Sequence, residues 1–261
     1  MSDDAPWEPD FDIYERSDED LRVVLLVDLA AHPVESHPHR LEVRVPLQRP
    51  REDGLRDTSE LEEFSACEDK LVSAVQERLS GLYLGRFTAG GSSTFLFHLP
   101  AEQAAAADIL GDLVGDLGPY AIEWQAEHDP EWELWGMAFE PDPFEHQQIF
   151  NRRLLKVFKD GGDDGTTPRQ VDHLAFFEAE ANARAAAAEL GEKGFAIDGL
   201  DQDDGDEDDA AGEGAEPGPW RVAFSREDPL AGGRADEFTA EILDILLTHQ
   251  GVYDGWGAPH A

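Results

Sequence analysis

Cysteine is almost absent from this sequence. A single cysteine, Cys67, excludes an internal disulfide and every metal or redox motif that is built on two neighbouring cysteines. Cys67 shares an apolar helical stripe with Phe64 and Leu71, a position typical of a small buried side chain and not of a nucleophile. We therefore expect Cys67 to belong to a hydrophobic core and assign it no chemistry.

Basic residues are scarce too, with 20 Lys and Arg against 58 Asp and Glu, so that the formal net charge is −38. Such a charge repels the phosphates of nucleic acids and of anionic membranes, because binding to them depends on Lys and Arg. It favours solubility above all, and in second place the attraction of a basic protein partner. We expect no direct binding to nucleic acid or to a membrane.

Long apolar runs are missing, since none approaches the roughly 20 residues that cross a bilayer. The chain starts with MSDDAPWEPDFD, which is acidic and polar where a signal peptide would be basic and then apolar. Together with the lack of disulfides, these features predict a cytoplasmic protein.

Catalytic signatures are missing as well. The sequence has no GxxxxGKS, GxxxxGKT, GxSxG or HExxH motif and no GxGxxG after a predicted strand, which argues against the phosphate-loop, hydrolase, zincin and dinucleotide classes. His32, His37 and His39 lack the cysteine or carboxylate spacing of a metal site. We expect no cofactor, no metal and no enzyme, although a first-domain site assembled from scattered side chains would leave no linear motif.

The first half of the chain predicts alternating strands and helices. The apolar run 23–29 and the alternation at 41–47 indicate two strands, which we expect to form an opening hairpin through the loop between them. Ser59 and Glu62 have the spacing of a capping box before a helix to residue 79. The further expected elements are a hairpin of 82–87 with 95–99, an Ala-rich helix at 101–117, a last strand at 120–126 and an edge strand at 130–143.

The second half predicts a domain of its own. We place the boundary at residue 142, with an N-terminal domain of unknown function at 1–142 and a second domain at 143–261. The second domain opens with a basic amphipathic helix, whose predicted apolar stripe is Phe150, Leu154, Val157 and Phe158.

The elements of this second domain then follow in the order strand, helix, strand, strand, helix, strand. This order packs two helices on one face of a four-stranded antiparallel sheet, and the first half has the same order from Leu41 onward. The predicted fold class is therefore α+β, with two tandem ferredoxin-like (βαββαβ) domains.

An acidic insertion at 198–217 separates the central strands of the second domain. Residues 198–216 include ten acidic and no basic side chains. A segment so charged buries too little apolar surface to order itself, so we expect a disordered loop that attracts cations or a basic segment.

The second domain resembles the bacterial regulator of ribonuclease E activity B. The motifs that carry the resemblance are DDGTTPRQVDHLAFF at 163–177, LGEKGFAI after an Ala-rich helix, and YDGWG at 253–257. The whole chain is similar to bacterial fusions of an N-terminal domain of unknown function with this regulator domain. The resemblance implies a ferredoxin-like regulator that binds the ribonuclease and lowers its RNA-cleaving activity without catalysis of its own.

Seven residues match the motifs of that family and are our predicted partner-binding residues: Asp172, His173, Tyr253, Asp254, Gly255, Trp256 and Gly257. Tyr and Trp are the side chains that most often anchor protein interfaces. The partner that the resemblance implies is a ribonuclease E-like endoribonuclease, with another basic protein as the alternative. An aromatic pair that closes the core at the last strand is an equally good interpretation of Tyr253 and Trp256.

A second class of function stays open, in which the protein is a small-molecule sensor with a ligand site at the interdomain join. Tandem ferredoxin-like domains often form ligand sites where they meet, and Trp132, Trp135 and Phe144 lie near the join in the sequence. Ligand-dependent quenching of tryptophan fluorescence would separate this function from protein binding.

Overall fold

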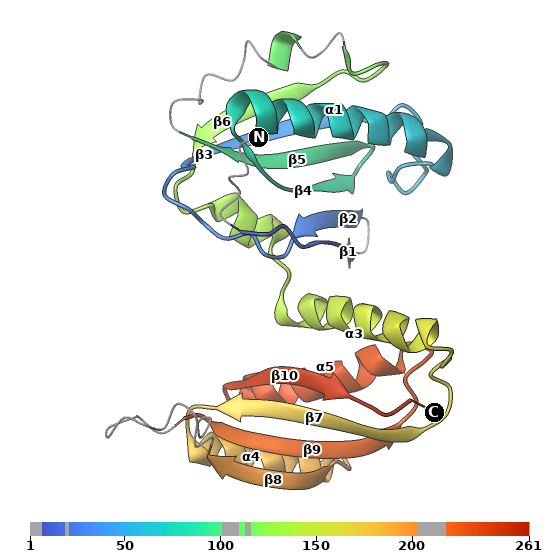
Figure 1. Ribbon diagram of the computed structural model, residues 1–261, viewed down its shortest axis with the longest axis vertical. Coiled ribbons are helices and arrows are strands. Elements are labelled where there is room, and N and C mark those ends of the chain that lie inside the picture. The colour runs from blue at the N-terminus through green and yellow to red at the C-terminus, as the bar shows by residue number, and fades with distance from the viewer. Residues whose placement is uncertain (1–6, 19–20, 101–109, 113–115, 203–217, 261) are drawn as a thin grey trace. The chain divides into compact units, whose positions relative to one another are not determined.

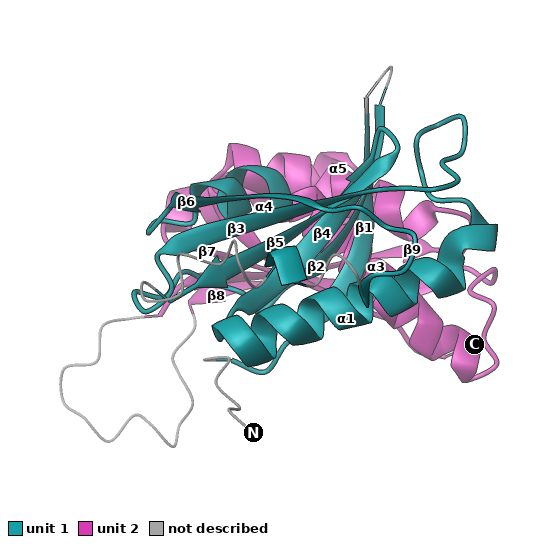
Figure 2. Ribbon diagram, turned by 90° about the horizontal axis from the view of Figure 1, so that it is seen from above, with its two compact units in different colours: residues 1–140 teal, residues 141–261 magenta. Residues whose placement is uncertain are grey.

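The computed structural model describes residues 7–18, 21–100, 110–112, 116–202 and 218–260. The chain divides into two compact units, Met1–Glu140 and Pro141–Ala261 (Figure 2). Each unit is built on one antiparallel sheet with helices packed against it (Figure 1), so the predicted α+β class with two ferredoxin-like domains is confirmed. Among the helices in these ranges, none is long and apolar enough to cross a membrane.

The first unit contains a six-stranded sheet. Its elements are β1 (Phe11–Asp18), β2 (Leu21–Asp28), β3 (His39–Pro46), η1 (Thr58–Glu60), α1 (Leu61–Leu79), β4 (Leu82–Ala89), β5 (Ser92–Leu99), β6 (Glu123–His128) and the π-helix η4 (Trp135–Phe139). The strand order is β1-β2-β4-β5-β3-β6, and every neighbouring pair is antiparallel. The strands β4-β5-β3-β6 have the ferredoxin-like order. The expected helix at 101–117 lies mostly outside the described residues.

Alternation of apolar and polar residues builds the centre of this sheet. Leu41, Val43 and Val45 on β3 are fully buried in one core with α1, while the alternate residues Glu42 and Arg44 face the other side. Asp57 caps η1, the short helix before α1, and its carboxylate accepts from the backbone N–H of Ser59 at 2.8 Å. The N-cap position of α1 is Glu60, whose side chain makes no capping hydrogen bond, so the predicted cap at Ser59 is wrong.

The predicted opening hairpin between residues 23–29 and 41–47 is also wrong. β2 pairs with β1 on one side and β4 on the other, whereas β3 lies between β5 and β6. The missing partner of β2 is β1, a strand that the acidic residues of FDIYERSD conceal. The hairpin at the start of the chain is therefore β1-β2, and residues 29–38 connect it to β3.

Residues 129–139, which we call the cover segment, lie on the outer face of this sheet, the face turned away from α1. The predicted edge strand at 130–143 is wrong, because the cover segment is largely helical and ends in η4. Trp132 stacks on the buried ring of His98 with 4.2 Å between the ring centroids, and the ring of Phe139 packs edge-on against Phe87 with 5.7 Å between the centroids. The aromatic side chains of the cover segment thus bury a face that a single layer of helices would leave open.

The second unit contains a four-stranded sheet. Its elements are α3 (Pro143–Asp160), β7 (Arg169–Phe177), α4 (Glu180–Glu192), β8 (Ala196–Gln202), β9 (Trp220–Asp228), α5 (Arg234–Thr248) and β10 (Gly251–Gly257). The order β10-β7-β9-β8, with all neighbours antiparallel, is the ferredoxin-like arrangement. Of the predicted insertion at 198–217, residues 198–202 belong to β8, which corrects that boundary, and 203–217 lie outside the described residues.

Helix α3 precedes the ferredoxin-like elements and packs on α5 (Figure 1). It begins at Asp142, which forms a capping box with the third residue of the helix. The predicted apolar stripe is only partly right, because Phe158 is buried whereas Phe150 and Val157 are 43% and 61% exposed. The fully buried amide of Asn151 lies on the inner side of α3 instead.

Candidate partner-binding site

A bulge in β10 decides which way the predicted site residues point. The register with β7 shifts between Tyr253 and Gly255, so Asp254 is an extra residue in the ladder. Gly255 has a φ of +126°, which residues with a side chain rarely adopt. In a regular strand, residues three apart face opposite sides, but here the extra residue turns Tyr253 and Trp256 to the same side, toward α5.

His173 and Tyr253 form the first half of a buried joint. The Nδ1 atom of His173 and the Tyr253 hydroxyl oxygen lie 2.7 Å apart. Three phenylalanine rings surround the imidazole at centroid distances of 5.6, 5.1 and 5.4 Å: Phe195, Phe224 and Phe238. Burial lowers the pKa of His173 to about 3, with a smaller contribution from the Arg226 guanidinium, and burial raises the pKa of Tyr253. Both side chains are therefore neutral near neutral pH.

Trp256 and Asn151 form the second half of the joint. Trp256 is 6% exposed, and its Nε1 donates to Oδ1 of Asn151 at 2.7 Å. The same oxygen accepts from Nε2 of Gln147 at 2.9 Å. Nδ2 of Asn151 donates to Oδ1 of Asp236 at 2.8 Å and to Oγ1 of Thr239 at 2.9 Å. The full hydrogen-bonding capacity of this amide is used, and the joint ties β10 to α3 and α5.

The seven predicted residues therefore divide into two groups. Three of them lie in the joint: His173, Tyr253 and Trp256. The others lie on the exposed side of β7, in the bulge or at the end of β10: Asp172, Asp254, Gly255 and Gly257. The indole of Trp256 is buried and hydrogen-bonded inside the unit, so it is not available to a partner. The accessible charged side chains of the set are those of Asp172 and Asp254. Contact of these residues with a partner stays a prediction.

A second buried pair, which sequence reasoning missed, explains the motif DDGTTPR. Asp163 and Arg169 form an ion pair whose side chains are 4% and 6% exposed. Nη1 of Arg169 also donates to the carbonyl oxygen of Pro259 at 3.0 Å, and Oδ1 of Asp163 accepts from the backbone N–H of Gly165 at 2.9 Å. The pair thus fixes the loop before β7 to the residues that follow β10. Its only sequence signal is an acid and a base within one short loop.

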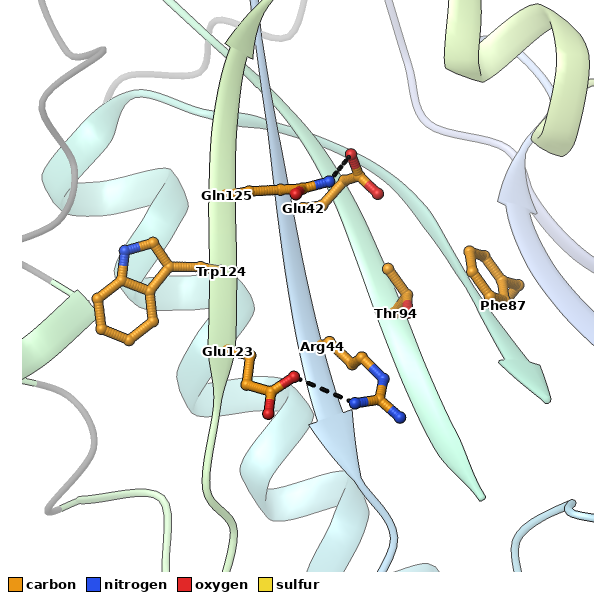
Figure 3. A pocket seen from close by; sticks show the side chains of 7 residues that line it. All are labelled: Glu42, Arg44, Phe87, Thr94, Glu123, Trp124 and Gln125. Atoms are coloured by element: carbon orange, nitrogen blue, oxygen red, sulfur yellow. Dashed lines mark hydrogen bonds and ion pairs between the residues drawn. The ribbon is translucent and has the colours of Figure 1, made fainter. Parts of the chain in front are cut away.

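A shallow pocket of about 230 Å³ lies on the outer face of the first sheet, beside the cover segment (Figure 3). Its lining residues are Glu42, Arg44, Phe87, Thr94, Glu123, Trp124 and Gln125. Arg44 pairs with Glu123 at 3.1 Å, and Nε2 of Gln125 donates to Glu42 at 2.9 Å. Because these polar groups already satisfy one another, a ligand here would have to replace existing pairs.

The two tryptophans proposed for a ligand site at the join are buried in the first unit. Trp132 is 1% exposed and donates its Nε1 hydrogen to the carbonyl oxygen of His37 at 3.1 Å. Trp135 is 5% exposed and stacks on Phe139 at 6.0 Å. Within the described ranges, no group of three or more His, Cys, Asp or Glu side chains is arranged to hold a metal ion. The sensor function stays a prediction.

Two family models match the chain, one on each unit. Residues 14–136 match a family of unknown function (DUF695), and residues 148–258 match regulator of ribonuclease activity B. The second unit is similar to this regulator family. The predicted fusion of a domain of unknown function with the regulator domain is thereby confirmed. We call Pro141–Ala261 the regulator-like unit.

Solved structures and curated proteins add little to this. An unknown protein from Galdieria sulphuraria is 12% identical, with a TM-score of 0.24, over 85% of this chain and 99% of its own. A protein described as a glycine cleavage system transcriptional repressor is 8% identical, with a TM-score of 0.26, over 85% of this chain and 98% of its own. At such TM-scores neither structure supports an inference. None of the curated proteins compared with the chain matches it.

Proposed function

We propose that this protein is a cytoplasmic, non-catalytic regulator whose regulator-like unit binds a ribonuclease E-like endoribonuclease and lowers its cleavage of RNA. The observation that carries the proposal is the match of residues 148–258 to regulator of ribonuclease activity B. The strand order β10-β7-β9-β8 supports it, because the matched residues contain one complete ferredoxin-like domain.

The chemistry of the predicted site suits binding better than catalysis. His173 is 4% exposed, and its lowered pKa keeps it uncharged, so it neither reaches a substrate nor holds a proton to donate near neutral pH. The exposed charged groups of the set are the carboxylates of Asp172 on β7 and of Asp254 in the bulge of β10. Carboxylates in this setting favour ion pairs with Lys and Arg of a partner.

The charge of the whole chain defines the chemistry of that partner. At a net charge of −38, the protein attracts a basic segment over distances longer than direct contact and repels RNA. Attraction between exposed charges weakens as salt shortens the Debye length. The proposed regulation therefore acts through the ribonuclease and depends on ionic strength.

The test is an RNA-cleavage assay in which the full-length protein is titrated into a purified ribonuclease E-like enzyme. We expect saturable inhibition, with an affinity that falls about tenfold or more between about 50 mM and about 500 mM salt. A gel-shift assay with the RNA substrate alone is the control and should show no binding. An unchanged cleavage rate at saturating protein would contradict the proposal, and equal affinity at both salt concentrations would remove its electrostatic part.

A further inference from the structure

The sheet of the regulator-like unit has one face that its helices leave uncovered. Along β7, alternate residues from Val171 to Phe177 are buried in the core with α4 and α5, so the residues between them face the other way. In Figure 1, α4 and α5 lie behind this sheet, and α3 runs along its β10 edge. We call the uncovered side the open face. The apolar residues at its centre are Leu174, Phe176, Ala223 and Val252.

The strand register places these apolar side chains next to one another in one patch, which we call the apolar patch. Phe176 lies opposite Val252 of β10, which is 67% exposed. Leu174 lies opposite Gly255 of β10 and Ala223 of β9. Gly255 and Ala223 flank Leu174, and the ring of Phe150 of α3 lies beside Gly255, 3.6 Å from the position that a Cβ atom there would occupy, so α3 borders the patch at the β10 edge. Such a surface fits a chain that lays its own large apolar side chains across the strands.

The charged residues around the apolar patch are mainly acidic. Exposed carboxylates stand on all four strands: Asp172 on β7, Asp201 on β8, Glu227 on β9 and Asp254 on β10. The basic residue in the same rows is Arg221, which pairs with Asp201 at 3.0 Å. The excess of carboxylates attracts Lys and Arg and repels phosphate.

The first unit shows what occupies the same face of the same fold. There, the cover segment lays Trp132 on His98 of β5 and Phe139 against Phe87 of β4. Leu96, on the outer side of β5, is fully buried. The strand of the regulator-like unit with the same place in the order is β9, and its outer side is partly accessible. Aromatic side chains from an added segment are therefore a fitting cover for this face.

We propose that the open face receives an extended basic segment of the protein partner. The segment packs aromatic or aliphatic side chains on the apolar patch and places Lys or Arg against the carboxylates around it. The identity of the partner as a ribonuclease rests on the proposed function, whereas the chemistry of the segment rests on the open face itself. Protein is favoured over RNA, because RNA-binding sheets of this fold carry basic residues beside their aromatic side chains.

The test compares two full-length variants with the same chemical change. Val252→Glu places a carboxylate in the apolar patch, and Leu247→Glu is the matched control on α5, where the leucine is 48% exposed. Binding to the ribonuclease E-like enzyme is measured by surface plasmon resonance, and folding by circular dichroism. We expect Val252→Glu to bind about tenfold more weakly or worse and Leu247→Glu to stay within about twofold of the wild type. Glu227→Lys should weaken binding and flatten its salt dependence more than Asp244→Lys on α5.

The outcomes separate this proposal from the proposed function. Equal binding by the wild type and both glutamate variants would overturn the open face as the docking surface and leave regulation of the ribonuclease intact. If the wild type does not bind the ribonuclease, the proposed function fails, and a synthetic peptide of alternating Arg and Phe decides about the surface. Binding of the peptide that Val252→Glu weakens and Leu247→Glu does not supports the open face for another basic partner. No binding of the peptide, or direct binding of an RNA oligonucleotide to the protein that Val252→Glu weakens, overturns it.

Discussion

Replacing Asn151 with alanine is the most direct test of the buried joint. The change leaves Nε1 of Trp256 and Nε2 of Gln147 without their acceptor, and both side chains are buried. Thr239 keeps a second hydrogen bond, from its hydroxyl to the carbonyl oxygen of Ala235 at 2.8 Å, and Asp236 is exposed to water. The expected loss thus comes from two stranded buried donors.

A buried donor without a partner costs about 1–3 kcal/mol, so Asn151→Ala should lower the free energy of unfolding of the regulator-like unit by about 2–6 kcal/mol. Trp256→Phe removes one of the two donors and keeps most of the ring, so it should cost less. In a double-mutant cycle of these two changes, the coupling energy should be about 1–3 kcal/mol, because the atoms lie 2.7 Å apart.

Amide hydrogen exchange of β7 and β10 in the full-length chain is the suitable assay, since a chain with two units need not unfold in one transition. Asn182→Ala is the matched control. Asn182 is half-buried, and its side chain donates one solvent-exposed hydrogen bond, to Gln250 at 3.2 Å, so the loss on Asn182→Ala should stay within about 0.5 kcal/mol. A loss below about 1 kcal/mol for Asn151→Ala would refute the account of the joint.

Three further changes test the loop, the bulge and the buried imidazole. Gly255→Ala should cost about 1–3 kcal/mol in hydrogen exchange of β10, because its φ of +126° strains any side chain, while Gly257→Ala should cost almost nothing; equal effects would argue against the bulge. Arg169→Met removes the arginine that pairs with the buried carboxylate of Asp163 and should cost about 3–5 kcal/mol in chemical denaturation. Arg184→Met, which breaks an exposed pair, should stay within about 0.5 kcal/mol, and similar losses would contradict the importance of burial. The pKa of His173 is about 3 in the folded unit against an ordinary value of 6.5. Below about pH 6.5 the unfolded chain therefore binds more protons than the folded chain, and the free energy of unfolding falls as the pH falls. Between about pH 7.5 and about pH 5 the loss of unfolding free energy is about 2 kcal/mol, and His173→Leu should abolish this loss. An unchanged dependence of stability on pH in this variant would show that another group is responsible.

Much of the fold could be predicted because the alternation of apolar and polar residues marks a half-buried strand wherever it lies in the chain. The buried and exposed positions of β3 and β7 follow a period of two, and the order of strands and helices then limits the sheet to few arrangements. The opening hairpin could not be found in this way, because the acidic residues around Ile13 and Tyr14 suppress the signal of β1. The prediction of an edge strand at the cover segment was wrong for a different reason, since composition does not say which face of a sheet an aromatic segment will cover.

The joint was only half visible in the sequence. Tyr253 and Trp256 could be interpreted as a closing pair of the core, and His173 as a core histidine. Asn151 could not, because a polar residue on an amphipathic helix is normally assigned to solvent, and the apolar Phe150 competed for the inner face. Three of its four partners stand 85, 88 and 105 residues along the chain, and local pattern carries no information about such contacts.

The joint and the open face have separable consequences for binding. Val252 precedes Tyr253 on the same strand but faces the opposite side, and the bulge after Tyr253 turns Trp256 inward. A change at Trp256 therefore weakens the edge strand that carries the open face, and loss of binding in such a variant reports on folding as much as on contact. A change at Val252 alters the surface alone. If a protein segment docks on the open face, the first kind of variant loses hydrogen-exchange protection and binding together, whereas Val252→Glu loses binding and keeps its protection.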